Sequence, residues 1–253
     1  MRYSLLAGGK RIRPVLALAT AEAVEADPDE VLPLAAAIEL IHTYSLIHDD
    51  LPAMDDDELR RGQPTCHVRF GEPVAILAGD GLFAEAIALV LERQPGEAER
   101  VRRALAELTG AAGVGGMVGG QYMDVADESA DIRHLHELKT GRLIAASIAC
   151  VLLLTGMSEP ATLPYRRFAA ELGVLFQIGD DSRHVTGDEA ALGKPQGSDE
   201  RHGKRTYVSV FGLERARELA AESHRKARTA LGETGGRTGT LEQITDYILT
   251  RDT

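Results

Sequence analysis

Acidic side chains gather densely in one short segment of the sequence. Residues 49–58 hold five aspartates and one glutamate, at positions 49, 50, 55, 56, 57 and 58. Carboxylates packed this closely repel one another unless hard cations neutralise them, and oxygen ligands favour Mg²⁺ over softer metals. Mg²⁺ seldom takes a cage made only of protein and usually bridges one or two carboxylates to substrate phosphates. Because Arg60 and Arg61 follow at once, the pattern predicts a magnesium site for a phosphorylated substrate.

A helix that ends at this segment aims its polar groups in one direction. His42 and Asp49 are seven residues apart and therefore share one helical stripe. Pro52 does not continue a helix comfortably, so we expect a loop there that returns Asp55 to the side of Asp49. A solvated acidic turn is the simpler alternative. A calcium loop of the EF-hand type fits less well, because Arg60 stands where that loop requires glycine.

A second polar stripe lies on an otherwise apolar helical window. Gln177, Asp180, Asp181 and His184 follow one another at helical spacing after the apolar residues 172–176. The exposed face of a helix would show the same pattern. Two acidic helix ends in one chain nevertheless favour a metal cluster that both helices share.

Cationic segments supply groups that complement an anion. In residues 8–14, Lys10 and Arg13 lie three apart on one helical face, and such side chains match phosphate oxygens. The segment is not a Walker loop, since Ser4 and Arg11 stand at positions that this motif reserves for other residues. Further lysines lie in the segments 139–142 and 193–204, at positions 139, 194 and 204. Each of these, taken singly, is more typical of a snorkelling surface lysine.

Helices must position all of these groups, because apolar residues recur with helical spacing and almost none alternate with a period of two. Beyond the windows that start near Lys10 and Leu34, helices are expected at residues 73–93, 98–109, 111–125, 132–154, 164–181, 205–231 and 241–251. Tryptophan is absent and aromatic residues are only 4%, a composition that lets helices approach closely in a bundle. We therefore predict an all-α, many-helix bundle that forms one domain over residues 1–253.

Charge and composition restrict the partners. The net charge of −11 disfavours nucleic acid and anionic membrane surfaces. Cys66 and Cys150 show no pairing signature, which favours a reduced, cytoplasmic setting. The longest apolar run, residues 143–154, is too short to span a bilayer and is expected to form a buried helix.

The order and spacing of six blocks resemble the polyprenyl (isoprenyl) diphosphate synthase family, in particular its bacterial short-chain farnesyl and geranylgeranyl type. The blocks are residues 8–14, 39–62, 119–124, 139–144, 176–181 and 187–207. This resemblance implies an isoprenoid synthase type I fold, a helical bundle around a deep central cavity, and a homodimer. Because Met1 falls just before the first block, where the family usually carries another helix, the resemblance also implies that this helix is missing or trimmed.

The resemblance implies a role for each site residue. Asp49, Asp50, Asp55 and Asp180 would bind three Mg²⁺ ions that grip an allylic diphosphate, either dimethylallyl or geranyl diphosphate. Arg60, Lys139, Lys194 and Lys204 would bind the same diphosphate, and Lys10, Arg13, His42 and Arg61 would bind isopentenyl diphosphate. Loss of the diphosphate leaves an allylic cation, which the double bond of isopentenyl diphosphate attacks. Catalysis would use Lys139, with Thr140 and Gln177 steadying the cation.

Two features of the sequence bear on the product and on the metal. Tyr44 stands five residues before Asp49, and with the Pro52-Ala53 insertion it resembles the farnesyl type, so we expect a C15 product, with C20 as the alternative. The second motif departs from the family, because residues 182–184 are Ser, Arg and His where a final aspartate is usual. Neutral imidazole binds Mg²⁺ poorly, so we expect a weak third ion and an active enzyme with a high magnesium requirement.

Two other functions remain open from the sequence. A class I terpene cyclase shares the fold and the ionisation step, but it needs no second diphosphate site, so Lys10, Arg13, His42 and Arg61 argue against it. A noncatalytic partner subunit of an active synthase would explain the altered second motif. It would not explain the intact acidic and basic block at residues 49–61.

Overall fold

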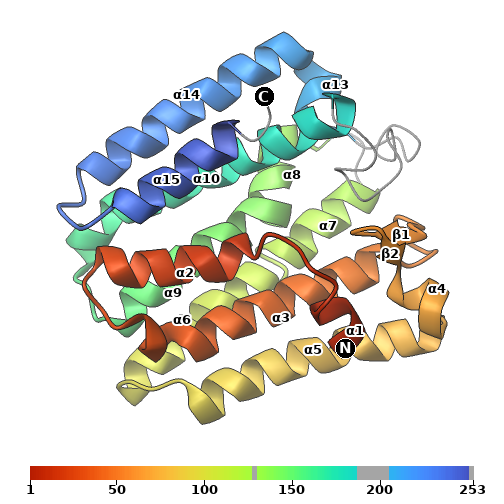
Figure 1. The fold of residues 1–253 in the computed structure, drawn as a ribbon, viewed down its shortest axis with the longest axis horizontal. Coiled ribbons are helices and arrows are strands. Elements are labelled where there is room, and N and C mark those ends of the chain that lie inside the picture. The colour runs from red at the N-terminus through yellow and green to blue at the C-terminus, as the bar shows by residue number, and fades with distance from the viewer. Residues whose placement is uncertain (127–129, 187–204, 251–253) are drawn as a thin grey trace.

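The protein is almost entirely helical, as predicted. The computed structural model describes residues 1–126, 130–186 and 205–250 (Figure 1). The helices are α1 (Arg2–Leu5), α2 (Ile12–Ala23), the 3₁₀ turn η1 (Pro28–Val31), α3 (Leu32–Asp49), α4 (Cys66–Phe70), α5 (Glu72–Arg93), α6 (Ala98–Ala112), α7 (Met117–Ala126), α8 (Ile132–His136), the π-helix η2 (Glu137–Gly141), α9 (Arg142–Leu154), α10 (Glu159–Thr186), α13 (Tyr207–Phe211), α14 (Leu213–Gly232) and α15 (Gly239–Thr250). A short antiparallel hairpin, β1 (Leu59–Arg60) and β2 (Gln63–Pro64), follows α3.

Helix α9 is the central element of the bundle. Helices α10 and α14 pack on one side of it, whereas α2, α3 and α5 follow one another on the other side, and α6 also packs on α9 (Figure 1). Its residues belong to both large hydrophobic clusters: Ile144 and Ile148 to the cluster shared with α10 and α14, Leu143 and Val151 to the cluster shared with α3 and α6. The apolar run at residues 143–154 is therefore a buried helix, as predicted.

Small residues let the helices that carry polar groups approach one another closely. A Cβ added at Gly120 of α7 would lie 2.3 Å from the backbone nitrogen of Lys139, and one added at Gly173 of α10 would lie 3.0 Å from the Cα of Gly141. Both contacts involve the π-helix η2, so α7 and α10 hold that segment between them.

Three of the predicted helical windows differ from the structure. The window at residues 205–231 is divided into α13 and α14, because Gly212 adopts a φ of +79°, which other residues rarely adopt. The window at 132–154 is interrupted by the π-helix η2, and the window at 111–125 is broken at residues 113–116, because α6 ends at Ala112 and α7 begins at Met117. Periodicity alone did not indicate these breaks, since the apolar spacing continues across them.

Two helical segments, residues 28–49 and 72–93, have the length and apolar composition of membrane spans. Half of the first window is buried within the bundle, and a third of the second. Core helices of soluble proteins pass the same test, so length and composition alone decide nothing about a membrane.

Candidate active site

The first aspartate cluster lies in a loop that returns to the end of α3. The backbone N–H of Asp55 donates a hydrogen bond to the backbone oxygen of Asp49 at 2.8 Å, and Met54 closes the turn on Leu51 at 2.8 Å. The predicted return of Asp55 to the side of Asp49 is therefore confirmed. Asp55 is buried, with 9% of its surface exposed. The loop thus gathers carboxylates that are six positions apart in the chain.

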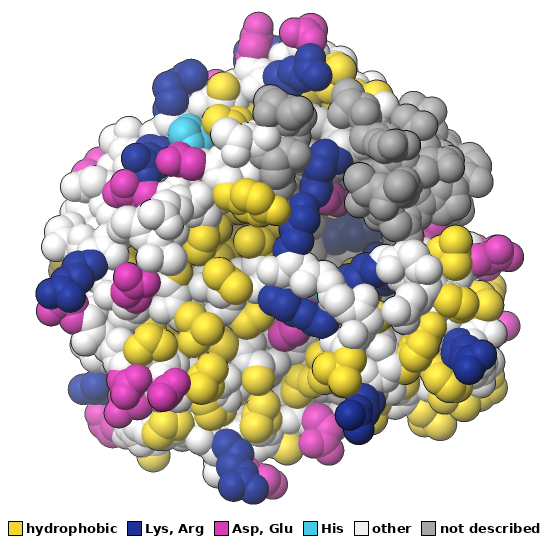
Figure 2. Space-filling model, viewed as in Figure 1, with side chains coloured by type: hydrophobic (Ala, Val, Ile, Leu, Met, Phe, Trp, Pro, Cys, Tyr) yellow, Lys and Arg dark blue, Asp and Glu magenta, His cyan; other side chains and the backbone are white. Residues whose placement is uncertain are grey.

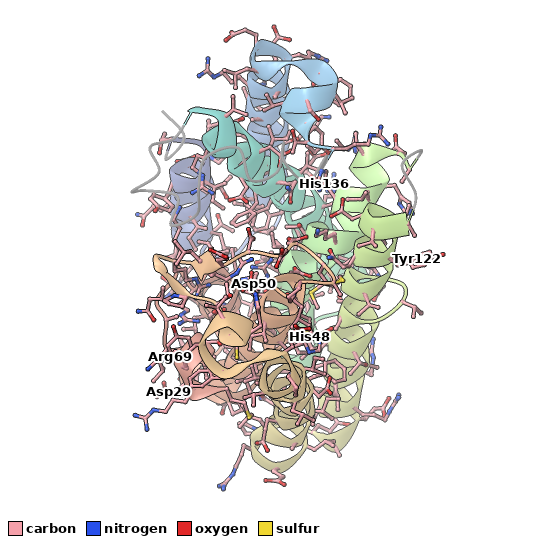
Figure 3. All side chains as sticks on the ribbon, turned by 90° about the vertical axis from the view of Figure 1, so that its right-hand side faces the viewer. Asp29, His48, Asp50, Arg69, Tyr122 and His136 are labelled. Atoms are coloured by element: carbon pink, nitrogen blue, oxygen red, sulfur yellow. The ribbon has the colours of Figure 1, made fainter. Side chains whose placement is uncertain are left out.

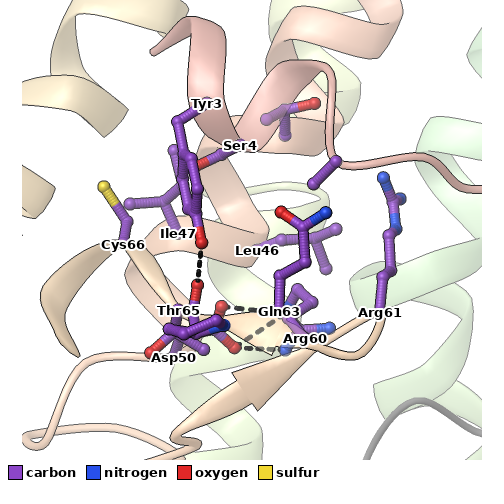
Figure 4. Close-up of a pocket in the computed structure, with 13 residues that line it drawn as sticks. Tyr3, Ser4, Leu46, Ile47, Asp50, Arg60, Arg61, Gln63, Thr65 and Cys66 are labelled. Carbon is purple, nitrogen blue, oxygen red and sulfur yellow. Dashed lines mark hydrogen bonds and ion pairs between the residues drawn. The ribbon is translucent and has the colours of Figure 1, made fainter. Parts of the chain in front are cut away.

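Arg60 is held by Asp50 beneath this loop. Its Nε donates to both carboxylate oxygens of Asp50, at 2.7 and 2.8 Å, and Asp57 lies 3.6 Å away (Figure 4). Burial by itself would lower the pKa of Arg60, but the hydrogen bond to Asp50 and the charges of Asp50, Asp49 and Asp57 outweigh it and raise the pKa. Asp50, expected to bind metal, therefore serves here as the counter-ion that orients Arg60.

A cationic pocket adjoins α3. Arg13 is buried, and burial lowers its pKa to about 10, against the opposing charges of Glu39 and Asp180. His42 has a pKa well below its ordinary value, first because it is desolvated and then because arginines surround it, chief among them Arg13 and Arg61. At neutral pH the imidazole is uncharged, and the neighbouring guanidinium groups carry the positive charge.

Arg61 reaches this pocket across the glycine segment before α2. Its guanidinium donates to the backbone oxygen of Gly8, and Arg11 donates to Glu39 and to the oxygen of Leu5. Gly9 has a φ of +106°, and a Cβ there would lie 2.3 Å from Arg61 Cζ. Glycine at position 9 therefore leaves the space that the guanidinium occupies. Lys10, the other predicted cation of this segment, has an exposed side chain.

The π-helix η2 presents Lys139 and Thr140. Lys139 Nζ contacts Asp124 Oδ2 of α7, and the hydroxyl of Thr140 donates to Gln177 Oε1 of α10 at 2.8 Å. A π-helix often marks a functional site, because its extra residue turns side chains that an α-helix would aim elsewhere. Asp124 was missed as a site residue, although it lies in one of the matched blocks.

The two carboxylates of the second aspartate motif, Asp180 and Asp181, have different partners. Asp181 is buried and accepts hydrogen bonds from Gln177 Nε2 at 2.7 Å and from the backbone N–H of Tyr207 at 2.6 Å. Asp180 is partly exposed and forms an ion pair with Arg183. Thr140, Gln177, Asp181 and Tyr207 thus form one chain of hydrogen bonds that joins η2, α10 and the start of α13.

Both acidic helix ends lie at the same end of the bundle. The charge of Asp180 acts on Arg13, and Arg13 in turn acts on His42 of α3, two turns before Asp49. Figure 3 faces this end, with Asp50 near the middle of the view and His136 above it. In Figure 2 a hollow with lysine and arginine side chains around it opens beside the residues that are not described.

Tyr44 lies on α3, five residues before Asp49 of the first aspartate cluster. Its ring makes edge-to-face contacts with Phe83 of α5, at 5.3 Å between centroids, and with His48, at 5.7 Å. Burial, followed by the charge of Asp49, raises the pKa of Tyr44 to about 12. The phenol is therefore neutral, and two aromatic neighbours hold it in place.

A small pocket, defined by residues of α1, α3 and the hairpin, lies behind the pair formed by Arg60 and Asp50 (Figure 4). Its volume of about 30 Å³ admits about one water molecule rather than a diphosphate. Tyr3 closes it from α1, donating a hydrogen bond to the oxygen of Pro64 at 2.8 Å. The pocket therefore belongs to the support of Arg60.

The donor set suits Mg²⁺ that arrives with a phosphorylated ligand. Asp49 and Asp55, whose backbones are joined by a hydrogen bond, carry hard oxygen donors. Among the described residues no group of three or more His, Cys, Asp or Glu side chains is arranged to hold a metal ion. Lys194, Lys204 and the side chain of His184 lie outside the described part of the chain.

Comparison with known proteins gives one consistent result. A family model described as polyprenyl synthetase matches residues 1–248. The farnesyl diphosphate synthase of Escherichia coli (strain K12) is 43% identical, over 100% of this chain and 88% of that protein. The heterodimeric geranylgeranyl pyrophosphate synthase large subunit 1 of Arabidopsis thaliana is also 43% identical, over 99% of this chain and 71% of that protein. The crystal structure of a Helicobacter pylori geranyltransferase, complexed with magnesium and isoprenyl diphosphate, has a TM-score of 0.86 at 32% identity and covers 98% of this chain and 85% of that chain.

Proposed function

Because this chain belongs to the polyprenyl synthetase family, we propose that it is a magnesium-dependent prenyltransferase that joins an allylic diphosphate head to tail to isopentenyl diphosphate. The observation that carries the proposal is the convergence of two aspartate-bearing helix ends and a buried cationic pocket at one end of the bundle. The allylic substrate is dimethylallyl or geranyl diphosphate, and the product is farnesyl diphosphate.

The diphosphate of the allylic substrate binds at the first aspartate cluster. Asp49 and Asp55 would hold Mg²⁺, which when bound would supply positive charge to offset the charge developing on the leaving diphosphate. Arg60 donates to the diphosphate from a direction that Asp50 sets, since two hydrogen bonds fix the plane of its guanidinium. Lys139 reaches the same group from η2, with Asp124 as its resting partner. Lys194 and Lys204 belong to the proposal by resemblance alone.

Isopentenyl diphosphate binds in the cationic pocket between the segment before α2 and α3. Arg13 and Arg61 contribute charge, Lys10 supplies a mobile cation, and neutral His42 donates a hydrogen bond. Burial is the main cause that lowers the pKa values of both arginines; Arg61 lowers that of Arg13 further, and Arg11 and Arg60 lower that of Arg61. A bound diphosphate offsets this concentration of positive charge. The bound substrate therefore balances the positive charge of the pocket.

The C–O bond to the diphosphate breaks first, and the allylic cation that remains forms a C–C bond with the double bond of isopentenyl diphosphate. The hydroxyl of Thr140 donates a hydrogen bond to Gln177 Oε1, so the lone pairs of its oxygen are available to face the cation. The departing pyrophosphate takes the proton that restores the double bond. Apolar walls exclude water, which would otherwise trap the cation as an alcohol.

Tyr44 limits the product to C15 in this proposal. The ring contacts Phe83 and His48 and lies five residues before Asp49 on α3, where a growing prenyl chain would meet it in this proposal. Relatives of this chain include farnesyl and geranylgeranyl synthases, so geranylgeranyl diphosphate is the alternative product.

We also infer that the chain is a cytoplasmic homodimer whose single domain spans residues 1–253. Helix α5 supports the dimer, since it exposes large apolar side chains, among them 69% of Leu77 and 66% of Leu91. Light scattering measures the mass of the protein in solution. The double variant Leu77→Glu/Leu91→Glu is expected to halve that mass, and a wild-type protein of monomer mass would disprove the dimer.

Incubation of the purified chain with labelled isopentenyl diphosphate, dimethylallyl diphosphate and Mg²⁺ tests the activity. Chromatography should show a labelled C15 alcohol after removal of the diphosphate. Asp49→Asn should abolish it, whereas Asp29→Asn, the same change at an exposed residue of η1, should not.

Two outcomes would replace the proposal. A hydrocarbon formed from farnesyl diphosphate alone would identify a terpene cyclase. A folded protein that stays inactive alone, but changes the product of an active synthase, would identify a partner subunit.

A further inference from the structure

The second aspartate motif contains a cation of its own. Arg183 lies one helical turn after Asp180 on α10, and its Nη2 is 2.5 Å from Asp180 Oδ1. Its Nε also approaches the backbone oxygen of Gly179 at 3.4 Å. Only 21% of the Arg183 side chain is exposed, against 41% of Asp180. The guanidinium therefore packs against the helix and accompanies the one carboxylate of this motif that is accessible.

The neighbouring aspartate, Asp181, makes hydrogen bonds that hold helices together. Asp181 uses one carboxylate oxygen to accept from Gln177 and the other to accept from the backbone of Tyr207. Only 3% of its surface is exposed. Because both oxygens of Asp181 are engaged and its side chain is buried, Asp180 is the more accessible ligand for an ion at this motif.

A second guanidinium acts on the same carboxylate. Arg13, buried at the start of α2, has its pKa shifted by the charge of Asp180, which places both groups in one electrostatic environment. A divalent ion at Asp180 would therefore meet two positive groups already present, and like charges at such separations repel strongly where water is scarce.

The first aspartate cluster is arranged differently. There, Arg60 is paired with Asp50 and Asp57, and Asp49 and Asp55 stand together at the loop. Among the described residues, carboxylates outnumber cations at the first cluster, whereas beside Asp180 they do not. The two ends of the proposed diphosphate site thus differ in local charge, and the first aspartate cluster is the more favourable place for a metal ion.

We propose that Arg183 is a built-in counter-ion that takes the place of the third magnesium ion, so that a bound diphosphate recruits two ions at the first aspartate cluster and meets the Arg183 guanidinium at the second. This rests on the proposed prenyltransferase function and names how that site balances charge. From the sequence we expect a weak third ion and a high magnesium requirement. The ion pair between Arg183 and Asp180 explains why a third ion would bind weakly. Because Arg183 already supplies positive charge there, the third ion is not needed.

Counting bound ions tests the proposal without turnover. Equilibrium dialysis with Mn²⁺ and inorganic pyrophosphate, followed by metal analysis, gives the number of ions per chain, and the electron paramagnetic resonance spectrum of bound Mn²⁺ reports their mutual coupling. The wild type is expected to bind two ions. Arg183→Leu removes the competing charge and should bind a third, with an affinity gain at Asp180 of about tenfold or more. Arg183→Lys retains the charge and should bind two.

Two double variants locate the third ion. Adding Asp180→Asn to Arg183→Leu removes the ligand and should return the count to two. Adding His184→Asp to Arg183→Leu supplies the usual acidic end of the motif and should tighten the third ion further. At Mn²⁺ concentrations that fill only two sites, Arg183→Leu should bind pyrophosphate about tenfold more weakly, because one charge-assisted contact is lost.

Three results would overturn the proposal: three ions in the wild type, an unchanged count in Arg183→Leu, or a third ion gained from His184→Asp alone. Failure of the proposed function looks different. If pyrophosphate brings no ions to the wild type, the diphosphate site itself is wrong and both ideas fall. If two ions bind but labelled isopentenyl diphosphate gives no product, only the prenyltransferase function is refuted.

Discussion

Replacing Gly9 with alanine is expected to damage one substrate site selectively. Gly9 has a φ of +106°, and an added Cβ would lie 2.3 Å from Arg61 Cζ and 2.6 Å from both terminal nitrogens of that guanidinium. Contacts this short cannot be kept, so Arg61 must leave its place between the glycine segment and His42. The cationic pocket proposed for isopentenyl diphosphate then loses one of its fixed charges.

The size of the effect follows from the charge that moves. A hydrogen bond to a charged group contributes about 1.5–3 kcal/mol, which corresponds to a rise in the KM for isopentenyl diphosphate of roughly ten- to a hundredfold. The strained backbone adds about 1–3 kcal/mol of lost stability. The KM for the allylic diphosphate should change little, because Arg60 is held separately by Asp50.

Gly8→Ala is the matched control. Gly8 also has a positive φ, of +88°, but a Cβ there meets nothing within 4 Å. Both variants therefore carry the backbone strain, and only Gly9→Ala displaces Arg61. Initial rates at varied concentrations of each substrate, with a thermal unfolding curve for each variant, separate the two effects. The reasoning is refuted if the two variants raise the KM for isopentenyl diphosphate equally, or if Gly9→Ala acts on the allylic substrate instead.

Three further predictions concern α3 and its neighbours. Tyr44→Ala should lengthen the product towards C20, and Phe83→Ala should do so in part by letting the phenol move; unchanged chain lengths by chromatography would refute both. Asp50→Asn should remove the closest counter-ion of the partly buried Arg60 and leave only Asp57 at 3.6 Å. It should therefore destabilise the fold by about 1.5–3 kcal/mol in urea unfolding and raise the KM for the allylic diphosphate. Because burial and then nearby arginines hold the pKa of His42 below 6.5, only the unfolded chain gains a proton there as pH falls from 7 to 5, so stability should decrease on acidification. His42→Gln should lose that part of the pH dependence, and an equal slope in both proteins would contradict it.

Local sequence patterns determined much of the helical architecture. The periodicity of apolar residues predicted α3, α5, α9 and α10, because a helix that buries one face must repeat its apolar side chains every three to four positions. Pro52 predicted the end of α3 and the loop that returns Asp55 to Asp49. These features depend on neighbours only a few residues apart, so the sequence carries them directly.

The breaks in the helices were less accessible from the sequence. Gly212 divides a continuous apolar pattern into α13 and α14 by its backbone conformation, and η2 inserts an extra residue without disturbing the apolar spacing. Close contacts from Gly120 and Gly173 accompany that π-helix. Such contacts are tertiary, and periodicity within one segment does not report them.

The sequence by itself determined which acidic and basic residue types are available to the proposed diphosphate site, since these groups and their order are written in it. Only the tertiary structure decided which charge pairs with which: Asp50 with Arg60, Asp181 with Gln177 and the backbone of Tyr207. The physical reason is that a carboxylate binds whichever donor the packed helices bring within hydrogen-bond distance, and burial then makes that choice costly to reverse. Packing decides which distant residues become hydrogen-bond and ion-pair partners, whereas the sequence decides which functional groups those residues carry.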